Sequence, residues 1–252
     1  MSTGIGDAVK RKEDKRFTTG KGKYTDDVRN DNQAYAAFVR SPYAHARVMG
    51  IDGSAALAMD GVIDVLNGAQ LTGDGIGNII CGWAVASKDG SPMNMGAWSA
   101  LATEKVRYVG DAVAVVIAET QALARIAAEK VEVSYEQLSV AASIAAARAN
   151  DAPEIHENAP GNLIYDWEIG DEAATDAGLA GAAHVTTLDV INNRLSPNPM
   201  EPRSAVATYD DSEEHYTLYT TSQNPHVARL VLSAFYNVAP EHKLRVIAPD
   251  GG

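Results

Sequence analysis

The sequence has almost no cysteine and no long apolar run. Cys81 is the only cysteine among 252 residues, which excludes an intramolecular disulfide framework and suits a reducing compartment. We expect its side chain to be a small buried hydrophobe rather than a nucleophile. No apolar stretch approaches the roughly 18 residues that a membrane span requires. Residues 1–17 also lack the apolar segment of a signal peptide. We therefore expect a cytoplasmic protein without a membrane span.

Positive charge is also scarce. The chain carries 21 Lys and Arg against 33 Asp and Glu, a net charge of −12. Basic residues cluster only near the N-terminus, at Lys10–Lys12 and at Lys15 and Arg16. Because phosphate binding depends on clustered Lys and Arg, this balance argues against nucleic acid as a partner. An apolar content of 46% is enough for a sizeable core in one large or two small domains.

Short catalytic and metal-binding motifs are missing as well. The sequence contains no HxxxH, CxxC or GxSxG, and its six histidines show no metal spacing on a common element. The glycines of residues 16–24 and 73–77 lack the context of a phosphate loop or a dinucleotide fingerprint. Acidic residues 210–214 are typical of a solvated hairpin turn and do not match a calcium loop. Spacing alone therefore predicts only a two-domain α/β protein.

Hydrophobic patterning predicts the regular elements of the first half. Val106–Val140 is expected to form a strand, a short helix capped by Thr120 and a second strand, as a compact parallel crossover. Further strands are expected within Gln33–Val48 and Gly61–Leu66, with loops from Gly68 to Ala100. An alanine-rich, helix-like segment then runs to Asn150–Pro153, which we interpret as a domain boundary.

The second half is expected to contain strands at Asn162–Gly170 and His184–Asn193, with a short helix between them in Asp171–Ala183. Ser204–Thr221 should form a hairpin. Asn224 and Pro225 are a fitting N-cap and first residue for a helix. An apolar stripe follows at helical spacing, at Val227, Leu230, Val231, Ala234 and Phe235.

Leu244–Ala248 is then expected to be a buried strand. Gln223 lies at the strand-to-helix junction, where α/β folds commonly place ligands. The chain stops at a glycine pair just after the strand, so we interpret it as interrupted rather than finished.

Several separate segments resemble one family, the molybdenum hydroxylases, in the large molybdopterin-binding subunit of the xanthine dehydrogenase, aldehyde oxidase and carbon monoxide dehydrogenase type. The segments that carry the resemblance are Arg11–Asp14, Arg16–Asp27, Val39–Ala46, Val106–Ala114, Val131–Glu136, Glu201–Arg203 and Thr221–His226. They cover nearly the whole chain in the family's order.

The resemblance implies an α+β fold: a hammerhead-type α/β domain, followed by the first mixed α/β portion of a molybdopterin-binding domain. We expect an N-terminal arm at 1–15, the hammerhead domain at 16–149 and the start of the cofactor domain at 150–252. The complete enzyme would hydroxylate a carbon centre of a small-molecule substrate with oxygen from water. Its cofactor would be a molybdopterin-type molybdenum cofactor in dinucleotide form. Electrons would pass to 2Fe-2S and FAD groups on iron–sulfur and flavin subunits.

The resemblance also assigns site residues. Gln223 corresponds to the glutamine that hydrogen-bonds the molybdenum's oxo ligand, and its amide NH2 is the donor. A helix-capping side chain is the alternative interpretation of Gln223. Gly251 and Gly252 match the start of a Gly-Gly-Phe-Gly loop that approaches the pterin closely, where a Cβ would intrude. The general-base glutamate and the rest of the molybdenum subunit lie outside this sequence, so the fragment alone is expected to be inactive.

A stand-alone binding or scaffold module derived from the same family is the alternative function. The two hypotheses differ in what the free chain exposes. As part of a larger subunit, it should expose the apolar surface of Ala112–Ile117 or of Val227–Phe235 and associate.

Overall fold

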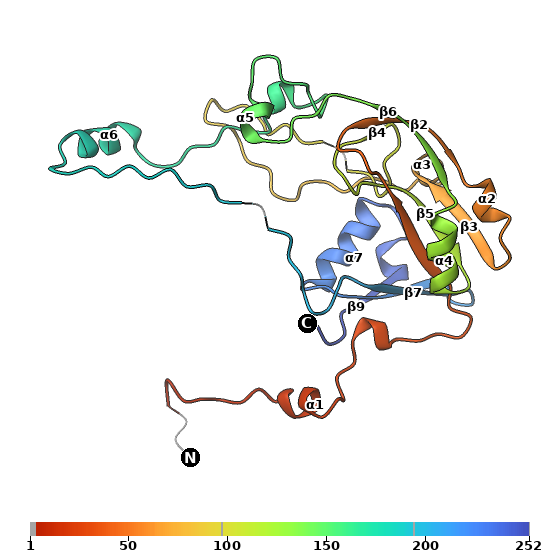
Figure 1. Ribbon diagram of the computed structural model, residues 1–252. Helices are drawn as coiled ribbons and strands as arrows, with labels where there is room; N and C mark the ends of the chain where they lie inside the picture. The colour runs from red at the N-terminus through yellow and green to blue at the C-terminus, as the bar shows by residue number, and fades with distance from the viewer. Residues whose placement is uncertain (1–3, 97, 194, 252) are drawn as a thin grey trace. The chain divides into compact units, whose positions relative to one another are not determined.

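The computed structural model describes residues 4–96, 98–193 and 195–251 (Figure 1). The chain forms two compact units. One is continuous, residues 34–197, and the other combines the two ends of the sequence, residues 1–33 and 198–252.

The first sheet of the continuous unit is built around strand β5, Ala112–Ala118. It pairs antiparallel with β1, Tyr35–Arg40, on one edge and with β3, Val62–Asn67, on the other. Helix α4, Gln121–Ala128, packs on β1 and β5 and begins as expected, because Thr120 Oγ1 accepts a hydrogen bond from Leu123 N at 3.2 Å. The continuous apolar run of β5 thus predicted a strand buried between neighbours.

The second sheet has the order β4–β2–β6, all antiparallel. Its strands are β2, Ala46–Asp52, β4, Lys105–Val106, and β6, Glu132–Gln137. The predicted parallel crossover is therefore wrong, since β5 and β6 lie in different sheets. Both edges of β5 are already occupied, which leaves β6 to pair with β2. Three side chains pack against the buried clusters of both sheets and make the core continuous, namely Val39, Ile51 and Val133.

Short helices lie between or after these strands. They are α2, Ser54–Leu57, α3, Gly68–Gly73, and α5, Ile144–Ala147. The prediction of loops throughout Gly68–Ala100 is wrong at its start, because a capping box sets the first turn of α3. Gln70 N donates to Asn67 Oδ1 at 3.0 Å, and Asn67 N donates to Gln70 Oε1 at 2.9 Å.

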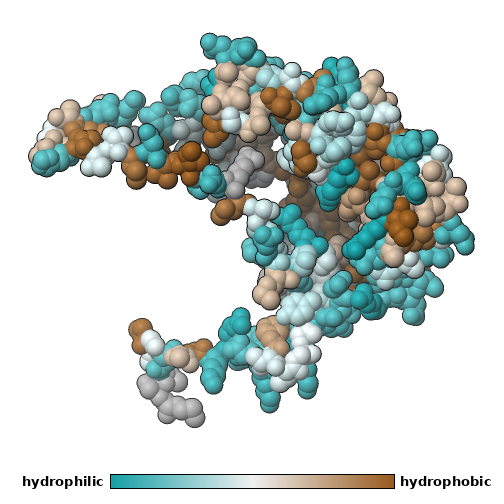
Figure 2. All heavy atoms as spheres, in the orientation of Figure 1, coloured by the Kyte–Doolittle hydropathy of each residue, from teal (hydrophilic) through white to brown (hydrophobic). Residues whose placement is uncertain are grey.

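Apart from helix α6, Glu172–Ala180, the described residues of 163–193 and 195–197 contain no helix or strand, and those around α6 form an extended arm (Figure 1). The helix confirms the prediction, but the strands expected at Asn162–Gly170 and His184–Asn193 are absent. No strand among the described residues pairs with either stretch. Figure 2 shows apolar side chains on the surface of this arm; they include Trp167, Ile169, Leu188, Val190 and Ile191.

Cys81 is exposed, which contradicts the expected buried role. It lies in irregular chain outside both buried clusters, and its Sγ contacts Trp83 O at 3.4 Å.

The unit made from the two ends of the sequence contains the sheet β7–β8–β9. Strands β7, Ala205–Asp210, and β8, His215–Thr220, form the predicted hairpin. Helix α7, Pro225–Ala234, leads from β8 to β9, Leu244–Ile247, which runs parallel to β8. The N-terminal segment adds helix α1, Asp14–Thr18, and a 3₁₀ turn at Thr25–Asp27.

The two apolar surfaces considered for exposure, Ala112–Ile117 and Val227–Phe235, differ in how far they are buried. Strand β5 is mostly buried, so Ala112–Ile117 is not the exposed one of the two expected surfaces. On helix α7, Val227 is 49% and Leu230 is 46% exposed. None of the helices in the described part of the chain has the length and apolarity that crossing a bilayer requires.

Candidate functional site at the carboxyl edge of β8 and β9

Strands β8 and β9 end at the same edge of their sheet because they are parallel neighbours. Tyr219 pairs with Ile247 at the end of the register. Gln223 and Gly251 each follow their paired residue by four positions. The fold thus brings two of the three predicted site residues to one sheet edge, the edge at which open α/β sheets bind ligands. Gly252 lies outside the described residues.

The chain between β8 and α7 leaves the Gln223 side chain available. Asn224 is the residue that caps α7, since its Oδ1 accepts a hydrogen bond from Val227 N at 3.1 Å. Ser222 Oγ in turn accepts from Asn224 N at 3.1 Å. Gln223 is exposed and takes no part in the cap, which removes the capping interpretation of its amide.

Gly251 has neither of the usual reasons for glycine within its own chain. Its φ lies outside the positive region, and a Cβ built on it would meet no described atom within 4 Å. Among the described residues, therefore, neither a strained turn nor packing requires glycine at this position. A group bound at this edge would meet the bare backbone of Gly251 and the exposed amide of Gln223.

Asp250, directly before Gly251, is held by residues from the other end of the sequence. Arg16 Nη2 donates to Asp250 Oδ1 at 2.6 Å, and Arg16 Nη1 donates to Oδ2. Lys23 N donates to Oδ2 at 2.7 Å, and Asp250 N donates to Lys23 O at 3.0 Å. The hydrogen bonds from Arg16 and from the Lys23 amide hold the pKa of the Asp250 carboxyl below its usual range. Patterning of the sequence gave no sign of this contact, because Arg16 and Asp250 are 234 positions apart.

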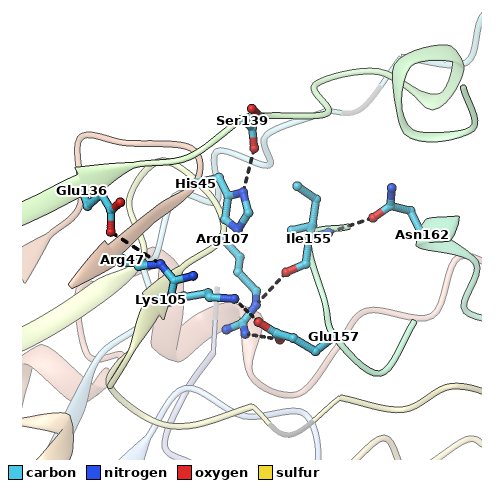
Figure 3. Close-up of polar contacts among 9 residues, drawn as sticks. All are labelled: His45, Arg47, Lys105, Arg107, Glu136, Ser139, Ile155, Glu157 and Asn162. Carbon is cyan, nitrogen blue, oxygen red and sulfur yellow. Dashed lines mark hydrogen bonds and ion pairs between the residues drawn. The ribbon is translucent and has the colours of Figure 1, made fainter. Parts of the chain in front are cut away.

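A second polar cluster lies in the continuous unit (Figure 3). Lys105 and Arg107 both point to Glu157, and Arg107 Nη2 lies 3.0 Å from Glu157 Oε2. The hydrogen bond from Lys105, with Arg107 beside it, lowers the pKa of Glu157 to about 2. Arg107 Nε also donates to Ile155 O at 3.0 Å. These contacts tie residues 155–157 to strand β4.

A cavity of about 720 Å³ adjoins this cluster and is lined by Trp98, Tyr108 and His156 among others. Burial, followed by the charge of Arg107, lowers the pKa of His156. The two cations of the cavity are already paired with Glu157. None of the predicted site residues lines it. We therefore take the β8–β9 edge as the candidate site and interpret the cavity cluster as structural.

No group of three or more His, Cys, Asp or Glu side chains in the described ranges is arranged to hold a metal ion. The site therefore offers an amide and bare backbone rather than direct metal ligands.

Comparison with known proteins defines the class of protein to which the chain belongs. Residues 19–139 match the family model of the aldehyde oxidase and xanthine dehydrogenase a/b hammerhead domain, and residues 155–252 match that of the molybdopterin cofactor-binding domain. The chain is thus a hammerhead domain joined to molybdopterin-binding sequence.

Similar proteins and solved structures show to which family within this class the chain belongs. The carbon monoxide dehydrogenase large chain of Afipia carboxidovorans is 38% identical over 99% of this chain and 31% of its own length. The nicotine 6-hydroxylase large subunit of Paenarthrobacter nicotinovorans is 34% identical over 98% of this chain and 29% of its own. The crystal structure of quinoline 2-oxidoreductase from Pseudomonas putida 86 matches with a TM-score of 0.87 at 33% identity, over 98% of this chain and 30% of that one.

The chain belongs to the molybdenum hydroxylase family of xanthine dehydrogenase, aldehyde oxidase and carbon monoxide dehydrogenase. Its α+β fold matches about 30% of the length of such solved chains, as the resemblance implied. It spans about 30% of the length of the first relatives named here.

Proposed function

We propose that this chain is the N-terminal portion of the molybdenum-cofactor subunit of a multi-subunit oxidoreductase. The observation that carries the proposal is the equal offset of Gln223 and Gly251 beyond the paired ends of β8 and β9. In this proposal, residues 16–149 form the hammerhead domain and residues 150–252 begin the cofactor domain. The limits of the two family models support that division.

A molybdopterin-type cofactor bound at this edge would supply the chemistry that hydroxylates a carbon centre with oxygen from water. The chain's own part is to bind and orient that group. Gln223 presents an amide NH2 as a hydrogen-bond donor from a junction that Asn224 has already capped. Gly251 and Gly252 leave the backbone uncovered for close approach.

The partners follow from the same assignment. The chain would work with the rest of a molybdenum subunit, an iron–sulfur subunit and a flavin subunit, and it would act on a small molecule. Support comes from relatives described as the large chain or large subunit of such dehydrogenases and hydroxylases. The dinucleotide form of the cofactor and the cytoplasmic location belong to this proposal as well.

The test is Gln223→Ala in the assembly purified from cells that make this chain. A hydrogen bond to a charged group contributes about 1.5–3 kcal/mol, so turnover per molybdenum should fall roughly 10- to 150-fold. Assembly and unfolding temperature should not change, because Gln223 is exposed and is not the cap. Gln121→Ala, which alters the exposed first residue of α4, is the matched control. Unchanged turnover in Gln223→Ala would remove the role given to this amide.

The stand-alone module makes the opposite prediction for the purified protein. Native mass spectrometry would then find a lone species of 26.6 kDa without metal. A larger assembly that contains molybdenum is the result expected here.

A further inference from the structure

Asp250 is fixed at both its side chain and its backbone. The two Arg16–carboxylate hydrogen bonds form a planar fork, which fixes orientation as well as distance. The Lys23 N–H to Asp250 Oδ2 and Asp250 N–H to Lys23 O bonds add a backbone bridge. We call Arg16 and Lys23 together the N-terminal clamp.

The clamp itself is held in place locally. The Arg16 guanidinium carbon lies 4.9 Å from the centroid of the Phe17 ring, a cation–π contact. The Asp250 side chain is only 13% exposed, whereas that of Arg16 is 43% exposed. Arg16 also lies in helix α1. The hydrogen bonds of this helix limit the backbone positions from which the guanidinium can reach Asp250.

The residue that follows cannot be held through a side chain. Gly251 has none, so only its backbone connects it to its neighbours. Glycine loses more conformational freedom on ordering than any other residue. The direction in which this loop starts is therefore set by the residue before it, and that residue is Asp250.

We propose that Arg16 is a positioning residue for the cofactor loop: the N-terminal clamp holds Asp250 so that the Gly251 backbone is ordered before the molybdopterin-type group binds. This inference rests on the proposed function. It gives the N-terminal segment, which lies far from the site in sequence, a direct part in cofactor loading. An ion pair that only stabilises the fold would have no such effect.

The experiment compares Arg16→Met, Arg16→Lys and Arg11→Met in the purified assembly. Arg11 is the matched control, because it forms an ion pair with Asp14 in the same segment and is 74% exposed. Two quantities are measured: molybdenum bound per chain, and turnover per bound molybdenum. Loss of supporting contacts around a metal site typically costs 10- to 100-fold, so Arg16→Met should lose molybdenum by roughly tenfold or more. Arg11→Met should retain it.

Arg16→Lys should restore only part of the occupancy, because an ammonium keeps the charge but cannot form the planar fork. If Arg16→Met does not fold, Asp250→Asn replaces it, since that variant keeps a side-chain carbonyl for Lys23 N but loses the charge and one of the two acceptors of the fork. Molybdenum content and turnover equal to wild type in whichever of these variants folds would overturn the inference, even if its unfolding temperature fell. Molybdenum absent from the wild-type assembly would instead overturn the proposed function, and the positioning role with it.

Discussion

Replacing Gly68 by alanine would push a Cβ atom into the backbone that passes over the first turn of helix α3. That atom would lie 2.7 Å from Leu101 O, 2.8 Å from Thr103 Cγ2 and 2.9 Å from Ala102 O. Two of these neighbours are carbonyl oxygens of the main chain, so they cannot move aside as the tip of a flexible side chain can. Gly68 is buried, which leaves no solvent side into which the turn could shift.

The expected cost of this overpacking is about 1–3 kcal/mol. At about 2 kcal/mol, the unfolding temperature of a domain of this size should fall by roughly 4–8 °C. Thermal unfolding followed by circular dichroism measures this directly, with urea unfolding as a check that the denaturant slope is unchanged.

Gly73→Ala is the matched control, since Gly73 ends the same helix and its added Cβ would meet no described atom within 4 Å. That variant should gain about 0.5 kcal/mol, because alanine restricts the unfolded chain. Opposite signs at the two ends of one helix are therefore predicted. A neutral or stabilising Gly68→Ala would refute the packing argument.

Two further predictions concern polar contacts. The pKa of Glu157 is lowered from 4.5 to about 2, so its contribution to stability is present above the unfolded pKa and is lost as the pH falls towards 2. Glu157→Gln should lower the unfolding temperature at pH 7, and a pH series of unfolding curves should show the difference from wild type narrowing below pH 4.5; a constant difference would contradict this account. Asn224→Ala removes the side-chain cap of α7 and should destabilise the protein by about 1 kcal/mol in urea unfolding, whereas Asn224→Ser should retain most of the stability.

The sequence predicted best those elements that local chemistry determines. Asn224 and Pro225 marked the start of α7, Thr120 marked α4, and the apolar run of β5 marked a buried strand, all as observed. Each of these signals acts within a few residues, so patterning can detect it. The capping box of α3 is just as local, and the Asn67 and Gln70 pair could have revealed it.

Pairing between distant segments was predicted poorly. Alternation in 184–193 is compatible with a strand, but a strand forms only where another edge accepts its hydrogen bonds, and no described strand does so. Likewise, nothing local to β6 shows that β1 and β3 already occupy both edges of β5.

The candidate site was likewise predictable only in part. Gln223 and Gly251 could be named from their own neighbourhoods and from the family resemblance. The parallel register that brings them to one edge appears only in the folded sheet. The Arg16–Asp250 contact required the tertiary structure, because nothing in either segment names the other.

A unit assembled from the two ends of the sequence also sets an order of events during synthesis. Asp250 emerges 234 residues after Arg16, which at about 5–20 residues per second is a delay of roughly 12–47 s. The N-terminal segment must wait through that interval while residues 34–197, which carry their own core, can already fold. Closing so long a loop around a finished unit costs less entropy than closing it around a flexible chain. Translation thus favours folding of the continuous unit before the unit that joins Arg16 to Asp250.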